Sequence, residues 1–427
     1  MREMKDSGIE WIGQIPKDWD VVPHKRVMHK VKKICEQYNG EDIISLTMNG
    51  VIKRDLTAGG KMPTSFDGYQ YVKPNDLLLC LFDIDVTPRC VGVVKDYGVT
   101  SPAYSRFVMH DGYYNAYYDY LLRAIDDDKV FVHLSKNLRS SLTENDFGAI
   151  KTCVPPLAEQ ARIAAFLDAE CAEIDAVLEK TRASIEEYKK LKQAVITQAV
   201  TKGIRGDRPM KDSGIEWIGD IPAEWSVVKG RRLILATQNG LTRRDLEKSE
   251  GYIVLKLKNL DADGSIDYSE VNRVALTDEE KYKYQLCDGD FLFVRVNGSR
   301  NLVGKCAIYH DVGEIVAYND HIIRVKLNDL CLKEYFHYYL LSIAGKREIE
   351  LHTSTAAGQF TISGDGLREL CVVLPGIVEQ AETVAYLDKK SAGIDALIAK
   401  KQQYLTEIEN YKKSLIYEYV TGKKEVV

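Results

Sequence analysis

A long, uninterrupted helical pattern occurs twice in this chain of 427 residues, and no other feature constrains its fold as much. The first copy runs from Pro155 to Lys202. It begins with two consecutive prolines, which suit the first turn of a helix because a missing N–H costs little there. Neither proline nor glycine interrupts it before Gly203, a typical helix stop. About 45 residues at a rise of about 1.5 Å each predict a rod of about 65 Å.

The second copy, from Pro375 to Gly422, aligns with the first at a constant shift, so that Glu379 corresponds to Glu159. In both copies mostly apolar residues recur in steps of four and three, with a few lysines among them. This seven-residue repeat is typical of helices that pack along each other. A register shared without a gap over so many turns predicts that the two helices meet. The seam positions are Ile174, Leu178, Thr181, Ile185, Tyr188, Lys192, Val195 and Ala199, followed by Ile394, Ile398, Lys401, Leu405, Ile408, Lys412, Leu415 and Tyr419.

A second repeat, with a shift of its own, places nearly the same sequence at 4–22 and at 210–228, with four differences in 19 positions. Each copy carries two tryptophans on either side of an Ile-Pro turn. We interpret the copies as docking arms whose indoles pack on a helix or a core. Direct stacking of the indoles on nucleic-acid bases is the alternative. The four tryptophans are Trp11, Trp19, Trp217 and Trp225.

Between each arm and its helix lies a globular stretch with short Val, Ile, Leu and Tyr runs broken by Gly, Asn and Asp, which predicts mainly strands and turns. The two stretches align weakly, with a shift that drifts from that of the arms to that of the helices. The chain is therefore expected to consist of two half-copies, each with an arm, a globular domain and a long helix. The expected domains are an arm at 1–22, a globular domain at 23–154, a long helix at 155–203, a second arm at 204–228, a second globular domain at 229–374 and a second long helix at 375–427.

Composition narrows the class of protein. The chain is 45% hydrophobic and 28% charged, and its net charge of −5 gives no global sign of nucleic-acid binding. Its first ten residues are polar and charged, so no signal peptide is expected. No apolar run approaches the length of a membrane span. Nine scattered cysteines without a C-x-x-C pair fit a reducing compartment, so the expected location is cytoplasmic, with no membrane contact.

The sequence also lacks the motifs of common enzyme classes. The stretch nearest to a phosphate-binding loop G-x-x-x-x-G-K-[ST] is Ser299–Cys306, which lacks the first glycine and the final Ser or Thr. Pro155-Pro156 lies between valine and leucine, so it is not the N/D-P-P-Y/F motif of adenine methyltransferases. The eight histidines form no metal-ligand cluster. These observations argue against a single-chain enzyme, and no catalytic residue, cofactor or metal is expected in this chain.

The arm SGIEWIG-IP-W, the helix start PPLAEQ-RIA-FLD and the two-fold repetition together resemble the specificity subunit of type I restriction–modification enzymes. The resemblance covers essentially all 427 residues. One departure is the start of the second helix, Leu374-Pro375-Gly376, where a double proline is missing. The resemblance implies an α/β fold in which two globular target-recognition domains are joined by two long antiparallel helices, with a pseudo-two-fold internal repeat.

The same resemblance implies a non-catalytic subunit that binds double-stranded DNA, with one recognition domain for each half of a split site. The long helices would act as a spacer and dock two modification (methyltransferase) subunits, which would bind S-adenosylmethionine. Restriction (motor–nuclease) subunits would supply translocation and cleavage that depend on ATP and Mg²⁺. A non-catalytic coiled-coil scaffold whose globular halves bind protein is the alternative.

Given this resemblance, Phe291–Lys305 is the sharpest candidate for DNA contact, because it is expected to form a hairpin with an alternating strand, an Asn-Gly turn and a basic return strand. Arg can bind guanine and Asn adenine bidentately, and Lys can bind phosphate. An ordinary surface hairpin is the alternative. The matching place in the first half is Asp83–Arg89, and further candidates are the loop Thr47–Lys61 and the stretch Lys136–Arg139, which matches His352–Gln359. The candidate contacts are Arg295, Asn297, Ser299, Arg300, Lys305, Arg89, Asn49, Lys53, Arg54, Arg139 and Gln359.

Overall fold

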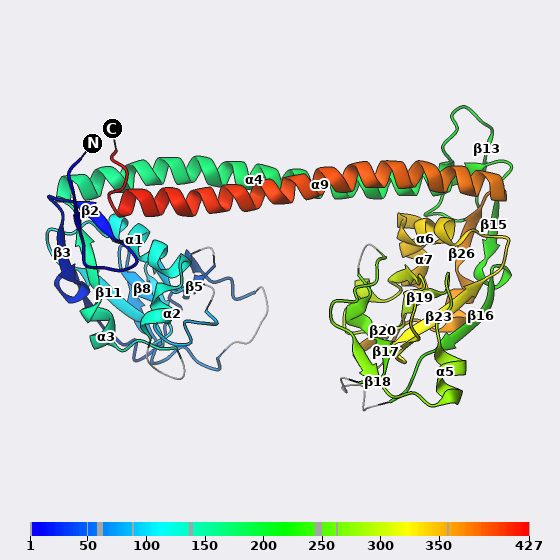
Figure 1. Cartoon of the computed structure of the whole chain (residues 1–427), viewed down its shortest axis with the longest axis horizontal. Helices are drawn as coiled ribbons and strands as arrows, with labels where there is room; N and C mark the ends of the chain where they lie inside the picture. Colours follow the sequence, from blue (N-terminus) through cyan, green and yellow to red (C-terminus); the bar gives the residue numbers. More distant parts are fainter. Residues whose placement is uncertain are drawn as a thin grey trace. The chain divides into compact units, whose positions relative to one another are not determined.

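The chain folds into two compact units (Figure 1). The first unit combines 1–182 with 403–427, and the second comprises 183–402. Each arm and each globular domain belongs to one unit, whereas the two long helices are shared between them. Both ends of the chain therefore lie in the first unit. The computed structural model describes residues 2–48, 50–57, 63–87, 89–135, 140–243, 250–261, 264–356 and 358–426.

A four-stranded antiparallel sheet forms the centre of the first globular domain, in the order β4-β11-β8-β9. The central strand β8 is covered on both faces, because Leu77 and Leu79 point into the main core and Leu78 into a smaller one. An unbroken run of leucines suits a strand that is buried on both faces, and helix α1 packs against β9. The bounds are β4 Met28–Val31, β8 Leu77–Leu79, β9 Val91–Val93, β11 Ser105–Met109 and α1 Asn115–Asp127.

The second globular domain repeats this sheet in the same order, as β16-β23-β19-β21. Its central strand β19 is again covered on both faces, with Phe291 and Phe293 in one apolar cluster and Leu292 and Val294 in another. Two three-stranded sheets, β18-β17-β22 and β20-β25-β24, complete the domain. The bounds are β16 Ile234–Asn239, β17 Tyr252–Leu255, β18 Asn272–Val274, β19 Phe291–Val294, β20 Val296–Asn297, β21 Cys306–Ile308, β22 Val316–Tyr318, β23 Ile322–Leu327, β24 Ser354–Ala356 and β25 Gln359–Thr361.

Both globular domains contain more helix than the expected mixture of strands and turns. Helix α1 has the sequence NAYYDYLLRAIDD, whose tyrosines and leucines favour strands when they are judged by residue type alone. Its buried residues Tyr117, Leu121 and Ile125 recur every four positions, which is the period of a helix packed on a core. Packing therefore overrides the strand preference of these side chains. The other helices of the globular domains are α2 Val130–Leu134, α3 Glu144–Ala149, α5 Asp278–Tyr284, α6 Lys333–Leu341, α7 Ile343–Leu351 and α8 Gly364–Glu369.

Short strands and single 3-10 turns are the remaining regular elements of the described chain besides the two long helices. In each unit, the strand after the arm pairs antiparallel with the strand just before a long helix: β3 with β12 and β15 with β26. The elements are β1 Met4–Asp6, β2 Gln14–Pro16, β3 Asp20–Pro23, η1 His24–Arg26, β5 Ile44–Thr47, β6 Gly50–Lys53, β7 Gln70–Val72, β10 Gly98–Thr100, β12 Lys151–Val154, β13 Met210–Asp212, β14 Asp220–Pro222, β15 Ser226–Lys229, η2 Gly230–Arg232, η3 Leu257–Asn259, η4 Arg300–Leu302 and β26 Cys371–Leu374.

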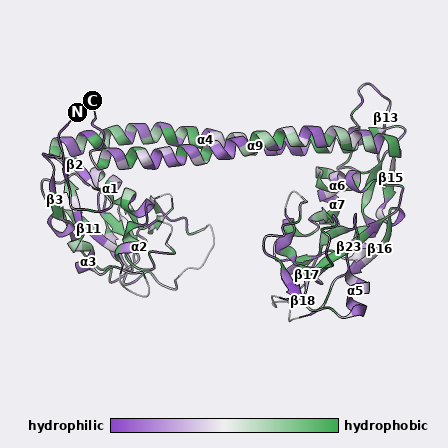
Figure 2. Cartoon of the chain, in the orientation of Figure 1, coloured by the Kyte–Doolittle hydropathy of each residue, from purple (hydrophilic) through white to green (hydrophobic). Residues whose placement is uncertain are grey.

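Both predicted long helices are present. Helix α4 runs from Leu157 to Lys202, and helix α9 runs from Ile377 to Val420. Gly203 and Gly422 follow them with φ angles of +80° and +69°, the left-handed conformation in which glycine commonly ends a helix. Figure 2 shows hydrophilic and hydrophobic residues alternating along both helices, as expected for helices that are buried on one side only.

The two helices run antiparallel inside the first unit. Lys412 Nζ donates to Asp175 at 2.6 Å, and Arg182 Nη2 donates to Glu409 at 2.6 Å. Rising residue numbers in α4 therefore meet falling residue numbers in α9. Exposed ion pairs such as these contribute at most about 1 kcal/mol each, so the pairing rests mainly on buried seam residues, of which Leu178 is one.

The second unit repeats this antiparallel arrangement with its own segments of the two helices. Lys192 Nζ donates to Asp395 at 2.6 Å, and the ammonium group of Lys401 lies 5.7 Å from the centre of the Tyr188 ring. The alignment of the two helical copies maps the Lys192–Asp395 pair onto the lysine–aspartate pair of the first unit, with the two helices exchanged. The shared register of the two seams is therefore confirmed at matching positions.

The first arm packs on the start of α4. The indole of Trp19 is fully buried, and its Nε1 donates to Glu159 at 3.0 Å. Arg2 donates to the same carboxylate and to Asp18, and its guanidinium lies 5.9 Å from the centre of the indole ring. These hydrogen bonds raise the pKa of Arg2 above its usual value, with the bond to Glu159 as the largest cause.

The second arm packs on the start of α9 in the same way. Trp225 is 1% exposed and donates from Nε1 to Glu379 at 2.7 Å. Arg208 donates from Nη1 to Glu379 at 2.5 Å and lies 4.8 Å from the centre of the Trp225 ring. Trp217 is exposed and donates from Nε1 to Glu348 at 3.1 Å. The buried indoles Trp19 and Trp225 pack on helices, as the docking-arm interpretation predicts.

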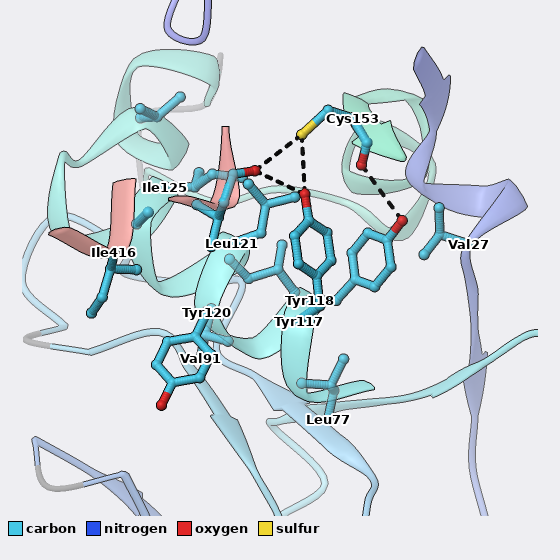
Figure 3. Packing of buried hydrophobic residues seen from close by; sticks show 14 of the residues in the cluster. Val27, Leu77, Val91, Tyr117, Tyr118, Tyr120, Leu121, Ile125, Cys153 and Ile416 are labelled. Carbon is cyan, nitrogen blue, oxygen red and sulfur yellow. Dashed lines mark hydrogen bonds between the residues drawn. The ribbon is translucent and has the colours of Figure 1, made fainter. Parts of the chain in front are cut away.

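The end of α9 is part of the core of the first unit (Figure 3). Tyr117 Oη on α1 donates to the carbonyl of Val420 at 2.8 Å, and the Sγ of Cys153 lies 3.5 Å from the same carbonyl. Tyr118 Oη reaches the carbonyl of Cys153 at 3.5 Å. Ile416 of α9 is buried in the same apolar cluster. The last turns of α9 are thus held by α1 and by the strand β12.

Candidate nucleic-acid interface

The segment after β19 does not form the predicted hairpin. All four residues of β19 are buried, without the expected alternation, and the chain leaves the sheet at Arg295. Strand β20 then pairs with β25, so Val296 lies opposite Thr361, which is far along the chain. Strand β21 does pair with β19, but the Asn297-Gly298 step is not the turn between them, because β20 and the 3-10 turn η4 intervene. The hairpin prediction was wrong because the partner of β20 is distant in sequence.

The three strands β20, β25 and β24 form a small sheet, called the polar sheet below. Gln359, Ser354 and Thr355 are exposed on it, and Asn297 is half-buried at its edge. The Oδ1 of Asn297 accepts a hydrogen bond from the backbone N–H of Ser299 at 2.9 Å, which fixes the turn that follows β20. The fold therefore brings Gln359 together with Asn297 and Ser299, which the sequence had placed in separate candidate regions.

Three basic residues lie on the segment that contains β20. Arg295 is half-buried and donates from Nη1 to the carbonyl of Asp320 at 3.1 Å. Arg300 is exposed and donates from Nη2 to the carbonyl of Glu350 at 3.2 Å. Lys305 is half-buried just before β21. Each arginine has five N–H donors and keeps donors available for a ligand, while the carbonyl contact limits the directions in which its guanidinium can point.

The first unit brings the corresponding segments together. The N–H of Leu142 donates to the carbonyl of Leu81 at 2.8 Å, and the N–H of Ile84 donates to the carbonyl of Ser140 at 3.1 Å. In the second unit, the N–H of Ile362 donates to the carbonyl of Arg295, just after β19, at 2.9 Å. This bond corresponds to the one between Leu142 and Leu81. In both units, then, the loop that follows the central strand lies against the stretch that precedes the last short helix.

Arg89 supports this loop in the first unit. Its Nε donates to the carbonyl of Val91 at 3.1 Å, and its Nη1 donates to the carbonyl of Met48 at 3.0 Å. Burial lowers the pKa of Arg89 below its usual value, and a neighbouring arginine adds to the effect. The buried carboxylate of Asp126 accepts from the N–H of Cys90 at 2.7 Å and holds the next residue. The structure therefore gives Arg89 a role in holding the loop that follows β8.

The other candidates of the first unit are more scattered. Lys53 is exposed and pairs with Asp42 at 2.7 Å, and the neighbouring Arg54 is half-buried. Asn49 and Arg139 lie outside the described residues. Base or phosphate contact by these four candidates stays a prediction.

Sequence reasoning missed one part of the polar sheet. Thr361 lies opposite Ser354, and their hydroxyl oxygens are 3.0 Å apart. The available signal was a pair of short polar runs on either side of Gly358, whose φ of +77° makes it a turn residue. Hydroxyls and amides on adjacent strands offer both donors and acceptors, as a surface that binds the edges of bases requires.

Neither a metal site nor a membrane-spanning helix is found among the described residues. Among those residues, no group of three or more His, Cys, Asp or Glu side chains is placed to hold a metal ion. No helix in the described part of the chain is long and apolar enough to cross a membrane. The chemistry that the candidate surfaces can perform is hydrogen bonding and charge pairing with a bound molecule.

Comparison with protein-family models finds no match. Among curated proteins, the EcoKI specificity subunit of a type I restriction enzyme from Escherichia coli (strain K12) is 27% identical over 281 residues, which cover 65% of this chain and 58% of that protein. The StySPI specificity subunit of a type I restriction enzyme from Salmonella potsdam is 28% identical over 282 residues, with the same shares of 65% and 58%. The chain thus spans less than two thirds of the length of these relatives.

Among solved structures, one chain of a type I restriction–modification system, described in terms of complex assembly and conformational transition, superposes with a TM-score of 0.69. It is 14% identical in sequence, and the match covers 96% of this chain and 99% of that one. At this identity the likeness concerns the fold. It confirms the predicted α/β architecture with two globular domains and two long helices.

Proposed function

We propose that this chain, a relative of the specificity subunits of type I restriction enzymes, acts as the DNA-binding specificity subunit of such a complex. Each unit binds one half of a split site in double-stranded DNA. The observation that carries the proposal is the repeated globular domain, because β4-β11-β8-β9 and β16-β23-β19-β21 are the same sheet built from different sequences. Two copies of one scaffold with different loops are suited to reading two different short sequences.

The reading surface of the second unit is proposed to be the polar sheet together with Arg295 and Arg300. Arginine and asparagine side chains recognise guanine and adenine through paired hydrogen bonds in the major groove. Hydroxyl and lysine groups beside them bind phosphates and fix the orientation of the duplex. In the first unit the equivalent surface is the loop after β8 with the stretch that precedes α3, which meet through the bond between Leu142 and Leu81.

The chain is proposed to have no catalytic activity of its own. Support comes from the sequence, which has neither a phosphate-binding loop nor an adenine methyltransferase motif, and from relatives that are named specificity subunits. S-adenosylmethionine, ATP and Mg²⁺ would then act on partner subunits. These partners are two modification subunits docked on the long helices and, for cleavage, restriction subunits. A cytoplasmic location fits the nine cysteines, all of which carry free thiols.

Purified components test the proposal directly. The chain alone should not methylate or cut DNA, and addition of a modification subunit should produce methylation at a split motif. Replacing 229–374 with the corresponding domain of a relative should change one half of the motif and leave the other half intact. Methylation by the chain alone in the presence of S-adenosylmethionine would refute the non-catalytic role, and a simultaneous change of both halves would refute independent reading by the two units.

The alternative, a coiled-coil scaffold whose globular halves bind protein, makes a different prediction. A scaffold would show no DNA affinity that falls steeply with salt, whereas a DNA-binding subunit should lose affinity linearly on a log–log scale. One titration of a labelled duplex at several salt concentrations, with the modification subunit present, separates the two functions.

A further inference from the structure

Residues 24–33, HKRVMHKVKK, form the most basic segment of the first globular domain. They contain five lysines and arginines, two histidines and no acidic residue, in a chain whose net charge is −5. The corresponding stretch of the second copy, 230–239, reads GRRLILATQN, with only two basic residues. One half of the internal repeat therefore carries a concentration of positive charge that the other half lacks.

The fold places this segment at the edge of the main sheet. It comprises η1 and the strand β4, and among the described strands only β11 pairs with β4. On the adjoining two-stranded sheet the exposed Lys151 lies opposite Pro23, next to the start of η1. All the cations of this region are exposed. The name basic edge is used below for Lys25, Arg26, Lys30, Lys32, Lys33 and Lys151.

Few acidic groups neutralise the basic edge. The Nζ of Lys30 lies 3.4 Å from Glu144 on α3, and Lys33 lies 5.4 Å from the centre of the Tyr71 ring. The nearby Asp146 of α3 is engaged in the capping box of its own helix with Thr143. The remaining four cations, Lys25, Arg26, Lys32 and Lys151, have no ion-pair partner in the described part of the chain.

Protection of an exposed strand edge does not explain this charge. Lysines on an edge strand prevent pairing with another chain, so the matching edge strand β16 should carry them too. Instead β16 has Leu235, which is 65% exposed, and Ala236 at the positions of His29 and Lys30. Of the two arginines just before β16, Arg231 is paired with Glu369 at 2.6 Å. The internal repeat thus shows that this sheet tolerates an edge without the cations.

We propose that the basic edge binds the phosphate backbone of the DNA duplex and gives the first unit sequence-independent contacts that the second unit does not make. The proposal rests on the proposed function. Duplex DNA carries one charge per about 1.7 Å of helix axis, so it can pair with several neighbouring cations at once. An acidic protein surface seldom offers such a row of charges, and lysine contacts to phosphate carry no sequence information.

Salt-dependent binding tests the proposal on the complex of the full chain with its modification subunit. The test variant carries Lys25→Gln with Lys32→Gln. The matched control carries Lys73→Gln with Lys95→Gln, which removes the same charge from exposed positions in the same domain, one of them after β9 at the opposite edge of the sheet. Affinity for a duplex with the methylated motif and for an unrelated duplex is measured over a series of KCl concentrations.

We expect the slope of log K against log salt to fall in magnitude by about 1.8 in the test variant, since each phosphate contact contributes about 0.9. Both duplexes should lose affinity by the same factor, and the methylated motif should stay unchanged. The control should keep the slope of the original chain. Lys25→Arg with Lys32→Arg should also keep it, which shows that charge at these positions is what the duplex requires.

Four outcomes would overturn the assignment. A slope unchanged in the test variant, or equal losses in test and control, would show that the basic edge makes no special contact. A changed motif would make these lysines readers of bases. Loss of the modification subunit with an unchanged DNA slope would assign the surface to a protein partner. Failure of the original chain to bind DNA in a salt-dependent way would instead refute the proposed function itself.

Discussion

His24 gives the first unit an acid sensitivity that has no counterpart at the matching position of the second unit. The side chain is fully buried and packs on the Phe147 ring at a centroid distance of 4.7 Å, and neither ring nitrogen has a hydrogen-bond partner among the described residues. Burial lowers the pKa of His24 from 6.5 to about 4. At the matching position the second unit has Gly230, where a Cβ would lie 2.4 Å from the carbonyl of Leu367, so no side chain fits there. The perturbation of interest is therefore His24→Leu.

The direction in which pH changes the stability of the first unit follows from the lowered pKa of His24. In the folded unit His24 stays neutral down to about pH 4, whereas in the unfolded chain it binds a proton below pH 6.5. Its contribution to stability is thus present above pH 6.5 and is lost as the pH falls toward 4. The full difference of about 2.5 pKa units, at about 1.36 kcal/mol each, amounts to about 3 kcal/mol. Between pH 7 and pH 5 the loss should be about 2 kcal/mol.

Native-state hydrogen exchange followed by mass spectrometry measures this loss in each unit separately. Peptides that contain β8 and β11 report on the first unit, and peptides that contain β19 and β23 report on the second. In the original chain, the opening free energy of the first unit should fall between pH 7 and pH 5 by about 2 kcal/mol more than in His24→Leu. Carboxylates that titrate in the same range cancel in this difference, because both proteins contain them.

The second unit provides the internal control, since its opening free energy should respond to pH equally in both proteins. If the first unit of His24→Leu lost as much stability between pH 7 and pH 5 as that of the original chain, His24 would not be the cause of the acid sensitivity. His24→Gln separates proton binding from packing: it should lower stability at pH 7 and still remove the additional pH dependence.

Three further predictions concern the core, the reading surface and the spacer. Asp76→Ala leaves the buried Arg106 without the carboxylate that it contacts at 2.6 Å. The first unit should therefore lose about 3–5 kcal/mol of stability, measured by hydrogen exchange. A loss below about 1 kcal/mol would contradict this prediction. Arg295→Ala should relax one position of the methylated motif and cost about 1–3 kcal/mol of discrimination between bases. Lys305→Ala should weaken binding to all sequences evenly and lower the salt slope by about one. An unchanged motif in methylation-sensitive sequencing would remove Arg295 from the reading surface. Insertion of four residues near Thr181 adds about 6 Å of rise and a net rotation of about 40°, so the unspecified spacer between half-sites should lengthen by one or two base pairs; methylation at the original spacing by a folded variant would show that α4 does not set it.

Local patterns predicted the long helices and the arms well. The ends of α4 and α9 follow from prolines at one end and from Gly203 and Gly422 at the other, and the seam follows from a seven-residue period, so neighbouring residues carry all the information. The burial of Trp19 and Trp225 could be anticipated because the arm recurs almost unchanged.

The candidate interface was harder to predict because its contacts join distant segments. From the sequence, strand β20 is expected to lead into an Asn-Gly turn and pair with the residues just after it. In the structure it pairs instead with β25, where Thr361 lies opposite Val296. Arg89 looks like a free cation, yet its donors hold the carbonyls of Met48 and Val91. Residue type and spacing cannot show whether a donor is used inside the fold, so single side chains in loops are the least predictable part of this chain.

The burial of the end of α9 in the first unit has a consequence for the order of folding on the ribosome. The core of that unit needs Leu415, Ile416 and Val420, which are translated after the whole of the second unit. Residues 183–402 form one continuous stretch, so the second unit can close as soon as it has left the exit tunnel. The first unit keeps an incomplete core until Val420 has also left the exit tunnel. The half of the chain that is made first is the half that matures last.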